Sequence, residues 1–421
     1  MQKDDLLRLL RDPNLIPSEK QTLLSRIAAQ AASMNMPCYL VGGFVRDLLL
    51  GRPVNDLDVI VEGDAIQLGN ALVKKYGGKL TLHHKFHTAV WHLPSTFNLH
   101  TKRSTLDLIT ARIESYSRPG ALPTVKPSTI EDDLHRRDFT VNAMAVRIDG
   151  NHFGELLDPL NGRSDLENKI IRVLHPHSFI DDPTRIFRAF RYEQRYSFNL
   201  EPSTLNIINP ESLAILKSLS GERIRHEFDL IFEEEKSFAM LLRLDELGVF
   251  NSFDPSLPKF NQKYSALLDF IPPTELGISI DRVMLGYLLW LMDSPGNIIE
   301  SMSTRLDFTS ELHKALLAAV LLKSELTLLK DANPSTWTFR LEQTPLPAVY
   351  ALWLVSSESA IIEFLTKWRH VKTHTTGDNL NARGLQPGPR YKEILTLLRA
   401  AWLDGEVKNL QEEKELLNKL L

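Results

Sequence analysis

The 421-residue sequence has a single cysteine, Cys38, and no long apolar run. One cysteine excludes an intramolecular disulfide and any metal site built from several cysteines, which fits a reducing compartment. The longest apolar run, residues 283–292, is too short to cross a bilayer. The N-terminus mixes acidic and basic residues and lacks the continuous apolar core of a secretory signal. We therefore predict a cytoplasmic protein that does not enter a membrane.

The sequence also lacks an excess of basic residues. Lys and Arg total 49 against 53 Asp and Glu, which gives a net charge of −4. A nucleic-acid partner would have to be bound by local basic patches, and composition alone neither supports nor excludes RNA. With 43% hydrophobic and 24% charged residues, the chain has the composition of an ordinary globular protein of two or three domains.

The hydrophobic pattern changes along the chain. Residues 26–148 mix β-branched runs with helical segments, whereas the periodicity is almost entirely helical from about Ser164 onward. We predict an α+β fold with strands at 38–41, 57–61, 88–92, 105–111 and 143–148. The predicted helices cover residues 65–75, 180–196, 202–208, 221–234, 238–247, 311–322 and 391–401. The predicted segments are an N-terminal helix (1–25), a head (26–150), a neck (151–255) and a body with a tail (256–421).

A glycine pair precedes a helix in LVGGFVRDLLLG, residues 40–51. Gly42 and Gly43 let backbone N–H groups approach a phosphate closely, and the phosphate would lie at the helix N-terminus. In the strand that follows, Asp56 and Asp58 share one face. Neighbouring carboxylates repel each other unless a cation joins them, and hard oxygen ligands suit Mg²⁺. The combination predicts a nucleoside triphosphate with Mg²⁺, although the acid pair alone would favour a solvated surface strand.

A third acid, Asp107, lies in the predicted strand 105–111. If its face looks toward Asp56 and Asp58, Asp107 joins the acid cluster. The alternative is a solvated strand acid or an ion-pair partner of Arg112.

Two arginines and an aspartate stand directly before an apolar strand or helix. In the segment 131–146, the forks of Arg136 and Arg137 suit triphosphate oxygens, and Asp138 suits ribose hydroxyls. The alternative is an exposed, ion-paired turn.

His83, His84 and His87 lack further ligands at metal-binding spacing, so we expect solvated imidazoles at a strand edge.

The predicted helix 180–196 carries a row of arginines at helical spacing: Arg185, Arg188, Arg191 and Arg195. Asp182 precedes Arg185 by one helical turn, so an acceptor and a donor can stand side by side. That pair matches the Watson–Crick edge of C or A, which presents an amine beside a ring nitrogen. The protein itself could then select the base without a template. The alternative is an N-terminal Asp with a solvated arginine stripe.

These segments together resemble, in order, the motifs of the class II tRNA nucleotidyltransferase and bacterial poly(A) polymerase family, within the polymerase β-like superfamily. The matching motifs are LVGGFVRDLLLG with DLD, RRDFTVNAMA, DPLNGRSDLENKIIR, DDPTRIFRAFR and GERIRHEF. The segments GDNLNARGLQPGPRYKEIL and LDGEV resemble the tail of bacterial CCA-adding enzymes. The resemblance covers about residues 38–230 and 377–407.

The resemblance implies a polymerase β-like head, followed by a helical neck, body and tail, and assigns roles to particular residues. It implies that Asp56 and Asp58 bind the metal and that Gly43, Arg46 and Arg137 bind the triphosphate. Asp138 would contact the ribose, and Asp182 with Arg185 would read the base. Arg188 and Arg191 would support that site or contact phosphate. Asp181 departs from the family, which commonly has glutamate there, and the shorter acid puts the tethering of this helix in question.

The implied activity is template-independent, Mg²⁺-dependent addition of C and A to the tRNA 3′ end from CTP and ATP, with one ion activating the primer hydroxyl and another holding the triphosphate. The helical body would grip tRNA by shape and phosphate contacts. No obligate protein partner is expected.

Other activities fit parts of the same resemblance. They are an A-adding enzyme, a CC-adding enzyme, a poly(A) polymerase and a catalytically silent RNA-binding protein. The segment between Asp107 and Arg136 is long enough for the loop that A addition requires in this family, which disfavours CC addition alone. The mixed charge of the C-terminus disfavours a poly(A) polymerase. The presence of both metal aspartates disfavours a silent protein.

Overall fold

The structure, a computed structural model, describes residues 3–54, 57–97, 105–253, 255 and 257–421. The chain forms two compact units, Met1–Leu219 and Ser220–Leu421. The segment predicted as a neck, 151–255, contributes residues to both units.

The first unit is built on a seven-stranded mixed sheet with the order β3-β4-β5-β2-β1-β8-β9. Its strands are β1 (Cys38–Val41), β2 (Asp58–Val61), β3 (Lys79–His83), β4 (Thr88–His92), β5 (Thr105–Thr110), β8 (Ala145–Arg147) and β9 (Glu155–Leu157). Strands β2 and β5 run parallel, and the other neighbours are antiparallel. The predicted strands are confirmed, three of them slightly shorter. Strand β3 was not predicted, although KLTLH alternates polar and apolar residues; it lies at an exposed edge of the sheet, and none of its residues is buried.

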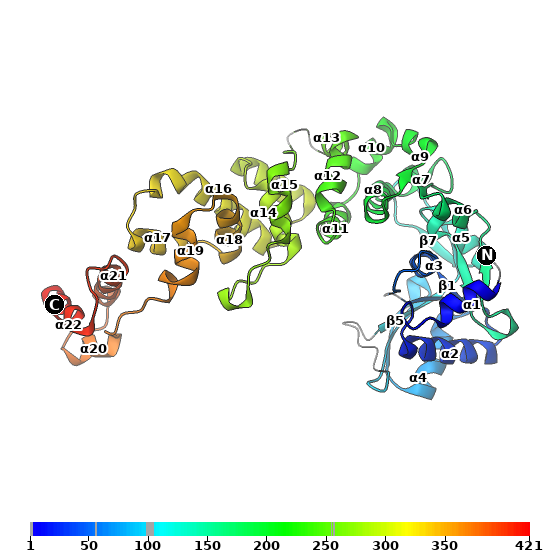
Figure 1. Cartoon of the computed structure of the whole chain (residues 1–421), viewed down its shortest axis with the longest axis horizontal. Coiled ribbons are helices and arrows are strands. Elements are labelled where there is room, and N and C mark those ends of the chain that lie inside the picture. The colour runs from blue at the N-terminus through cyan, green and yellow to red at the C-terminus, as the bar shows by residue number, and fades with distance from the viewer. Residues whose placement is uncertain (1–2, 55–56, 98–104, 254, 256) are drawn as a thin grey trace. The chain divides into compact units, whose positions relative to one another are not determined.

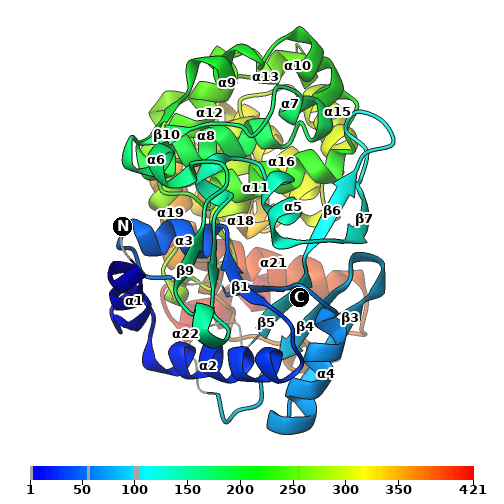
Figure 2. The ribbon, with the colours of Figure 1, turned by 90° about the vertical axis from the view of Figure 1, so that its right-hand side faces the viewer.

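One face of this sheet is covered by α2 (Ser18–Ser33) and α4 (Ala65–Tyr76), which lie side by side (Figures 1 and 2). A Cβ on Gly69 of α4 would lie only 3.1 Å from Leu80 and 3.4 Å from Leu108, so the helix packs closely on β3 and β5. The opposite face carries a hydrophobic cluster in which Ile60 packs with Ile130 of α5 (Ile130–His135). Because side chains alternate along a strand, Asp58 and Asp107 lie on this second face.

The remaining elements of the first unit are short. They are α1 (Lys3–Arg11), α3 (Gly43–Leu49), α6 (Gly162–Glu167), α7 (Ser178–Asp181), α8 (Arg185–Tyr196), α9 (Pro202–Asn206) and α10 (Pro210–Lys217), with the hairpin β6 (Arg112–Ser115) and β7 (Thr124–Pro127) and the pair β10 (Ile170–Ile171) and β11 (Asn199–Leu200).

The prediction of one helix over residues 180–196 is wrong at its start. Helix α7 ends at Asp181, and α8 begins only at Arg185. Asp182 is extended, with φ −136° and ψ 94°. Pro183 explains the break, because a proline disfavours the helical conformation of the residue before it. Asp182 therefore lies in a linker that leads into α8.

The described part of the second unit consists of helices joined by loops. These are α11 (Gly221–Phe232), α12 (Ser237–Glu246), α13 (Val249–Phe253), α14 (Arg282–Leu291), α15 (Gly296–Leu306), α16 (Ser310–Leu329), α17 (Pro334–Leu341), α18 (Leu346–Ser356), α19 (Ser359–Thr366), α20 (Gly377–Ala382), α21 (Pro389–Leu403) and α22 (Leu410–Leu420). A Cβ on Gly286 would lie 2.2 Å from the ring of Phe232, so α14 and α11 are in close contact. An α+β head followed by helical regions is thus confirmed. None of the described helices has the length and apolar character needed to cross a membrane.

A buried carboxylate, Glu413, holds the C-terminal helices together. It accepts hydrogen bonds from the backbone N–H groups of His374 (3.0 Å) and Thr375 (2.6 Å), and from Nε1 of Trp402 (2.5 Å). Burial alone would raise the pKa of Glu413, but these hydrogen bonds outweigh burial and lower the pKa.

Replacing Glu413 by Gln should destabilise the tail by about 1–3 kcal/mol, because buried donors lose their charged acceptor. Amide hydrogen exchange of residues 374–420 measures this loss. Since the folded pKa is lowered, the stabilisation is present above the unfolded pKa of about 4.3 and disappears as the pH falls through the folded value. Glu415→Gln is the control, because exposed Glu415 accepts only from Gln411 in the hydrogen bonds described (3.0 Å). Equal exchange rates in both variants would contradict the role of Glu413.

Candidate active site

The glycine turn between β1 and α3 brings backbone close to an arginine. Gly42 has φ +62°, in the left-handed region, and its N–H donates to the carbonyl of Met144 (3.2 Å). A Cβ on Gly42 would lie 2.5 Å from Nη1 of Arg137, and one on Gly43 would lie 3.4 Å from Nη2 of Arg46. Glycine is therefore required at position 42 both for the backbone angle and for the approach of a guanidinium.

Arg46 ties α3 to other parts of the head. Its buried guanidinium donates to Oδ1 of Asn142 (2.6 Å) and, through two nitrogens, to Asp47 (2.9 and 3.0 Å). Its Cζ lies 4.5 Å from the ring centroid of Tyr196 in α8. Burial opposes the charge, yet the hydrogen bond with Asp47 raises the pKa of Arg46 above its ordinary value. Arg46 thus orients the α3 turn relative to α8.

Asp133, in α5, is fully buried and holds both arginines of the RRD segment. It accepts from Nη2 of Arg136 (2.7 Å) and from Nη2 of Arg137 (3.0 Å). Nε of Arg137 is buried and has no hydrogen-bond partner among the described residues. A buried donor without a partner is costly, so this atom is suited to receive an acceptor from a ligand.

Asp138 is buried between the head and α8. Its Oδ2 accepts from Nε and Nη2 of Arg188 (2.8 and 2.6 Å), and its Oδ1 accepts from Nδ2 of Asn142 (3.0 Å). Burial opposes ionisation, but Arg188 and Asn142 prevail and lower the pKa of Asp138 to about 2. Asp138 is therefore an anion at neutral pH, and its pair with Arg188 joins the RRD segment to α8.

The base-reading pair of the sequence analysis lies at the start of α8. Arg185 is buried and donates to Oγ of Ser178 (2.7 Å) and to the carbonyl of Arg136 (2.9 Å). Oδ1 of Asp182 accepts from Oγ1 of Thr184 (2.7 Å). Arg191, farther along α8, is also buried. The Arg185 guanidinium is thus held at a set position beneath the RRD segment.

The two described acids are register partners. Asp58 of β2 pairs with Asp107 of the parallel strand β5, and both side chains are exposed on the same face. The glycine turn leaves β1 close to them, because Leu40 pairs with Val59 next to Asp58. Asp56 lies outside the described residues, and within them no group of three His, Cys, Asp or Glu side chains could hold a metal ion. Two neighbouring carboxylates nevertheless fit Mg²⁺, which takes one or two carboxylates together with phosphate oxygens.

Tyr116, which sequence reasoning missed, lies near Asp182 and Arg185, the two residues predicted to read the base. Its hydroxyl donates to Glu114 (3.1 Å), which also accepts from Arg136 (2.8 Å). Burial and the charge of Glu114 raise the pKa of Tyr116 to about 12, while the charge of Arg185 opposes the rise. The alternating pattern R-x-E-x-Y at residues 112–116 was the available signal. Asn142, the partner of Arg46 and Asp138, carried no such signal.

Gly42→Ala should disturb this site more than Gly51→Ala. Both residues have positive φ angles, +62° and +67°, which strain any other residue, and Gly42 combines its φ with ψ −124°, a conformation that glycine alone adopts readily. Nothing lies within 4 Å of a Cβ on Gly51, whereas on Gly42 the Cβ would displace Arg137. Nucleotide affinity, measured by calorimetry, should fall only in the Gly42 variant. Equal affinities of the two variants would contradict a role of the turn beyond its backbone angle.

Two family models match the chain. The Poly A polymerase head domain covers residues 38–172, and the probable RNA and SrmB-binding site of polymerase A covers residues 197–260.

Full-length relatives and solved structures extend the match. An A-adding tRNA nucleotidyltransferase of Geobacter sulfurreducens is 33% identical over 95% of this chain, which spans about half (47%) of that protein's length. One of Halalkalibacterium halodurans is 31% identical over 97% of this chain and 94% of its own. The structure of a Thermotoga maritima CCA-adding enzyme with tRNA superimposes with a TM-score of 0.75 and 26% identity over 99% of this chain and 98% of that one.

Proposed function

Because the chain belongs to the tRNA nucleotidyltransferase family, we propose that it extends the 3′ end of tRNA from nucleoside triphosphates without a nucleic-acid template. The observation that carries the proposal is the pairing of Asp58 with Asp107 beside the glycine turn. This arrangement sets carboxylates for a cation next to backbone and guanidinium donors for phosphate. A purely RNA-binding protein would need no such neighbourhood.

Divalent metal is expected in this family, and we propose Mg²⁺, held by Asp58 and Asp107 with Asp56. When bound, the metal would neutralise triphosphate charge and favour the ionised form of the attacking hydroxyl. The remaining residues bind and orient. Arg137 would donate its Nε to a phosphate oxygen, while Arg46 would keep the glycine turn in place.

The residues that we propose for binding the ribose and the base lie on α8 or next to it. Asp138 is ionised and can accept from a ribose hydroxyl, provided that its pair with Arg188 loosens or leaves one lone pair open. Asp182 and Arg185 would read the amine and ring nitrogen that C and A share. Arg188 and Arg191 would support this surface from the same helix.

Addition of A to a tRNA that ends in CC is common to the two leading candidates. The first candidate is a CCA-adding enzyme, supported by the full-length likeness to the Thermotoga maritima structure. The second is an A-adding enzyme, supported by the full-length likeness to the A-adding tRNA nucleotidyltransferase of Halalkalibacterium halodurans. They differ only in whether CTP is used on shorter tRNA ends.

The second unit offers a place for the body of the tRNA. A cavity of about 1080 Å³ is lined by cationic and aromatic side chains, among them Arg369, Lys372, Tyr391 and Lys392. Cationic side chains bind phosphates irrespective of base, which suits a partner recognised by shape. We propose that this cavity contacts the tRNA backbone.

Incubation of the protein and Mg²⁺ with tRNA transcripts ending before CCA, after C and after CC tests the function. Each transcript is given CTP, ATP or both. We expect A to be added to the CC end; extension of all three transcripts would select the CCA-adding candidate, and extension of the CC end alone would select the A-adding one.

Asp58→Asn should lower incorporation by at least about 1000-fold, because a metal ligand is lost, while the circular dichroism spectrum of the variant stays unchanged. Incorporation by Asp58→Asn at the wild-type rate would rule out the proposed site.

Arg185→Lys should relax the choice among the four nucleotides by about tenfold in kcat/KM ratios, because lysine keeps the charge but lacks the planar fork. Competition among the four triphosphates on a CC-ending tRNA measures this ratio. Arg195→Lys, on the exposed end of the same helix, is the matched control. If Arg185→Lys keeps wild-type selectivity, the base is read elsewhere.

A further inference from the structure

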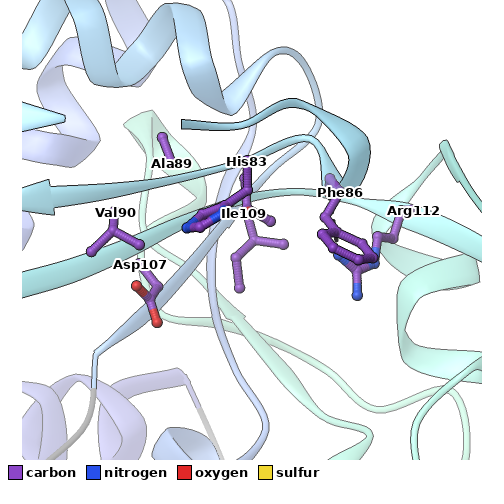
Figure 3. Close-up of a pocket in the computed structure, with 8 residues that line it drawn as sticks. His83, Phe86, Ala89, Val90, Asp107, Ile109 and Arg112 are labelled. Carbon is purple, nitrogen blue, oxygen red and sulfur yellow. Dashed lines mark hydrogen bonds between the residues drawn. The ribbon is translucent and has the colours of Figure 1, made fainter. Parts of the chain in front are cut away.

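A second pocket lies on the sheet next to the paired acids. Its volume is about 330 Å³, and its lining includes Asp107 of β5, His83 of β3, Phe86 and Arg112. Figure 3 shows Asp107 at one end of the pocket, Phe86 with Arg112 at the other, and His83 between them. The pocket thus extends from a proposed metal ligand along β5 toward the loop between β3 and β4.

The strand order decides what this pocket can hold. From one edge, the order is β3-β4-β5-β2-β1-β8-β9, so the acids of β5 and β2 lie in the middle. The proposed phosphate and ribose residues lie on the β1 and β8 side, because Gly42 follows β1 and Asp138 bonds to Asn142, just before β8. Phosphoryl transfer places the attacking and leaving oxygens roughly in line on opposite sides of the phosphorus. With the triphosphate on the β1 side, the attacking hydroxyl must come from the β5–β4 side.

We propose that this pocket holds the 3′-terminal nucleotide of the tRNA primer, with its base stacked on Phe86. The inference rests on the proposed function and adds to it a site for the acceptor. Phe86 lines the pocket and is 37% exposed, so part of its ring is open to a stacking base. Nζ of Lys85 lies 5.7 Å from its ring centroid and can reach a neighbouring phosphate.

The loop that carries Phe86 is held in place. Nη1 of Arg112 donates to the carbonyl of Phe86 (3.3 Å), while Nη2 of Arg112 bonds to Glu114 (3.0 Å). Arg112 is therefore a positioning residue, and its guanidinium is engaged with protein groups. The ring of Phe86 is presented by a braced loop, which lowers the entropic cost of stacking a base.

The test is a thermodynamic cycle on equilibrium binding of tRNA ending in CC, followed by fluorescence anisotropy without triphosphate. One change is Phe86→Ala, and the other is removal of the base from the terminal nucleotide. Each change alone should weaken binding about tenfold, the scale of one base–aromatic stack. The two changes combined should weaken binding no more than either change alone. Phe86→Trp, which keeps a stacking surface, should bind like the wild type.

Leu82→Ala is the matched control. Leu82 lies in the same hairpin with nearly the same exposure, 38%, but it pairs with buried Ala89 on the α4 side of the sheet. The Leu82→Ala variant should bind both RNAs, the tRNA ending in CC with and without its terminal base, as tightly as the wild type does. Additive losses in the cycle, or unchanged binding in Phe86→Ala, would overturn the inference. Absence of nucleotide incorporation by the wild type would instead contradict the proposed function, because binding is measured independently of transfer.

Discussion

The ion pair between buried Asp138 and half-buried Arg188 is the interaction on which the candidate site depends. A carboxylate taken out of water is stable as an anion only if it is paired and hydrogen-bonded, and Asp138 meets both conditions through Arg188 and Asn142. The pair connects the RRD segment with α8. Together with the contact of Arg46 with Tyr196 and the hydrogen bond from Arg185 to the carbonyl of Arg136, it fixes the residues that follow β1 relative to α8.

The same reasoning explains how a protein of net charge −4 can offer an anion-binding surface. Carboxylates pair with some of the nitrogens of its arginines. Asp133 forms ion pairs with Arg136 and Arg137, and Asp47 forms one with Arg46. Each carboxylate fixes a guanidinium without using all of its donors, as the unpartnered Nε of Arg137 illustrates. Local pairing thus orients positive charge while the overall charge stays slightly negative.

Local patterns predicted the fold well where the cause is local. Strands β1, β4 and β5 were predicted almost to the residue. Strand β1 is a short run that is buried throughout, and β4 and β5 alternate between buried and more exposed residues. The prediction of one helix over residues 180–196 was wrong because it followed the helical periodicity and neglected Pro183, which interrupts the helix. The residue types of the candidate site could be read from motifs, but the partners Asp133, Asn142 and Tyr116 could not, since their roles arise only from tertiary contacts.

Asp107 shows the limit most clearly. Alternation placed it on a strand face, but the face it shares with Asp58 depends on the register between β2 and β5, which are separated by a helix and a hairpin along the chain. Register is set by cross-strand packing that a single strand does not encode. The same strand order separates the glycine turn from the Phe86 pocket on either side of the acids. The proposed active site therefore depends on the sheet as a whole, because no single motif specifies which strands flank the acids.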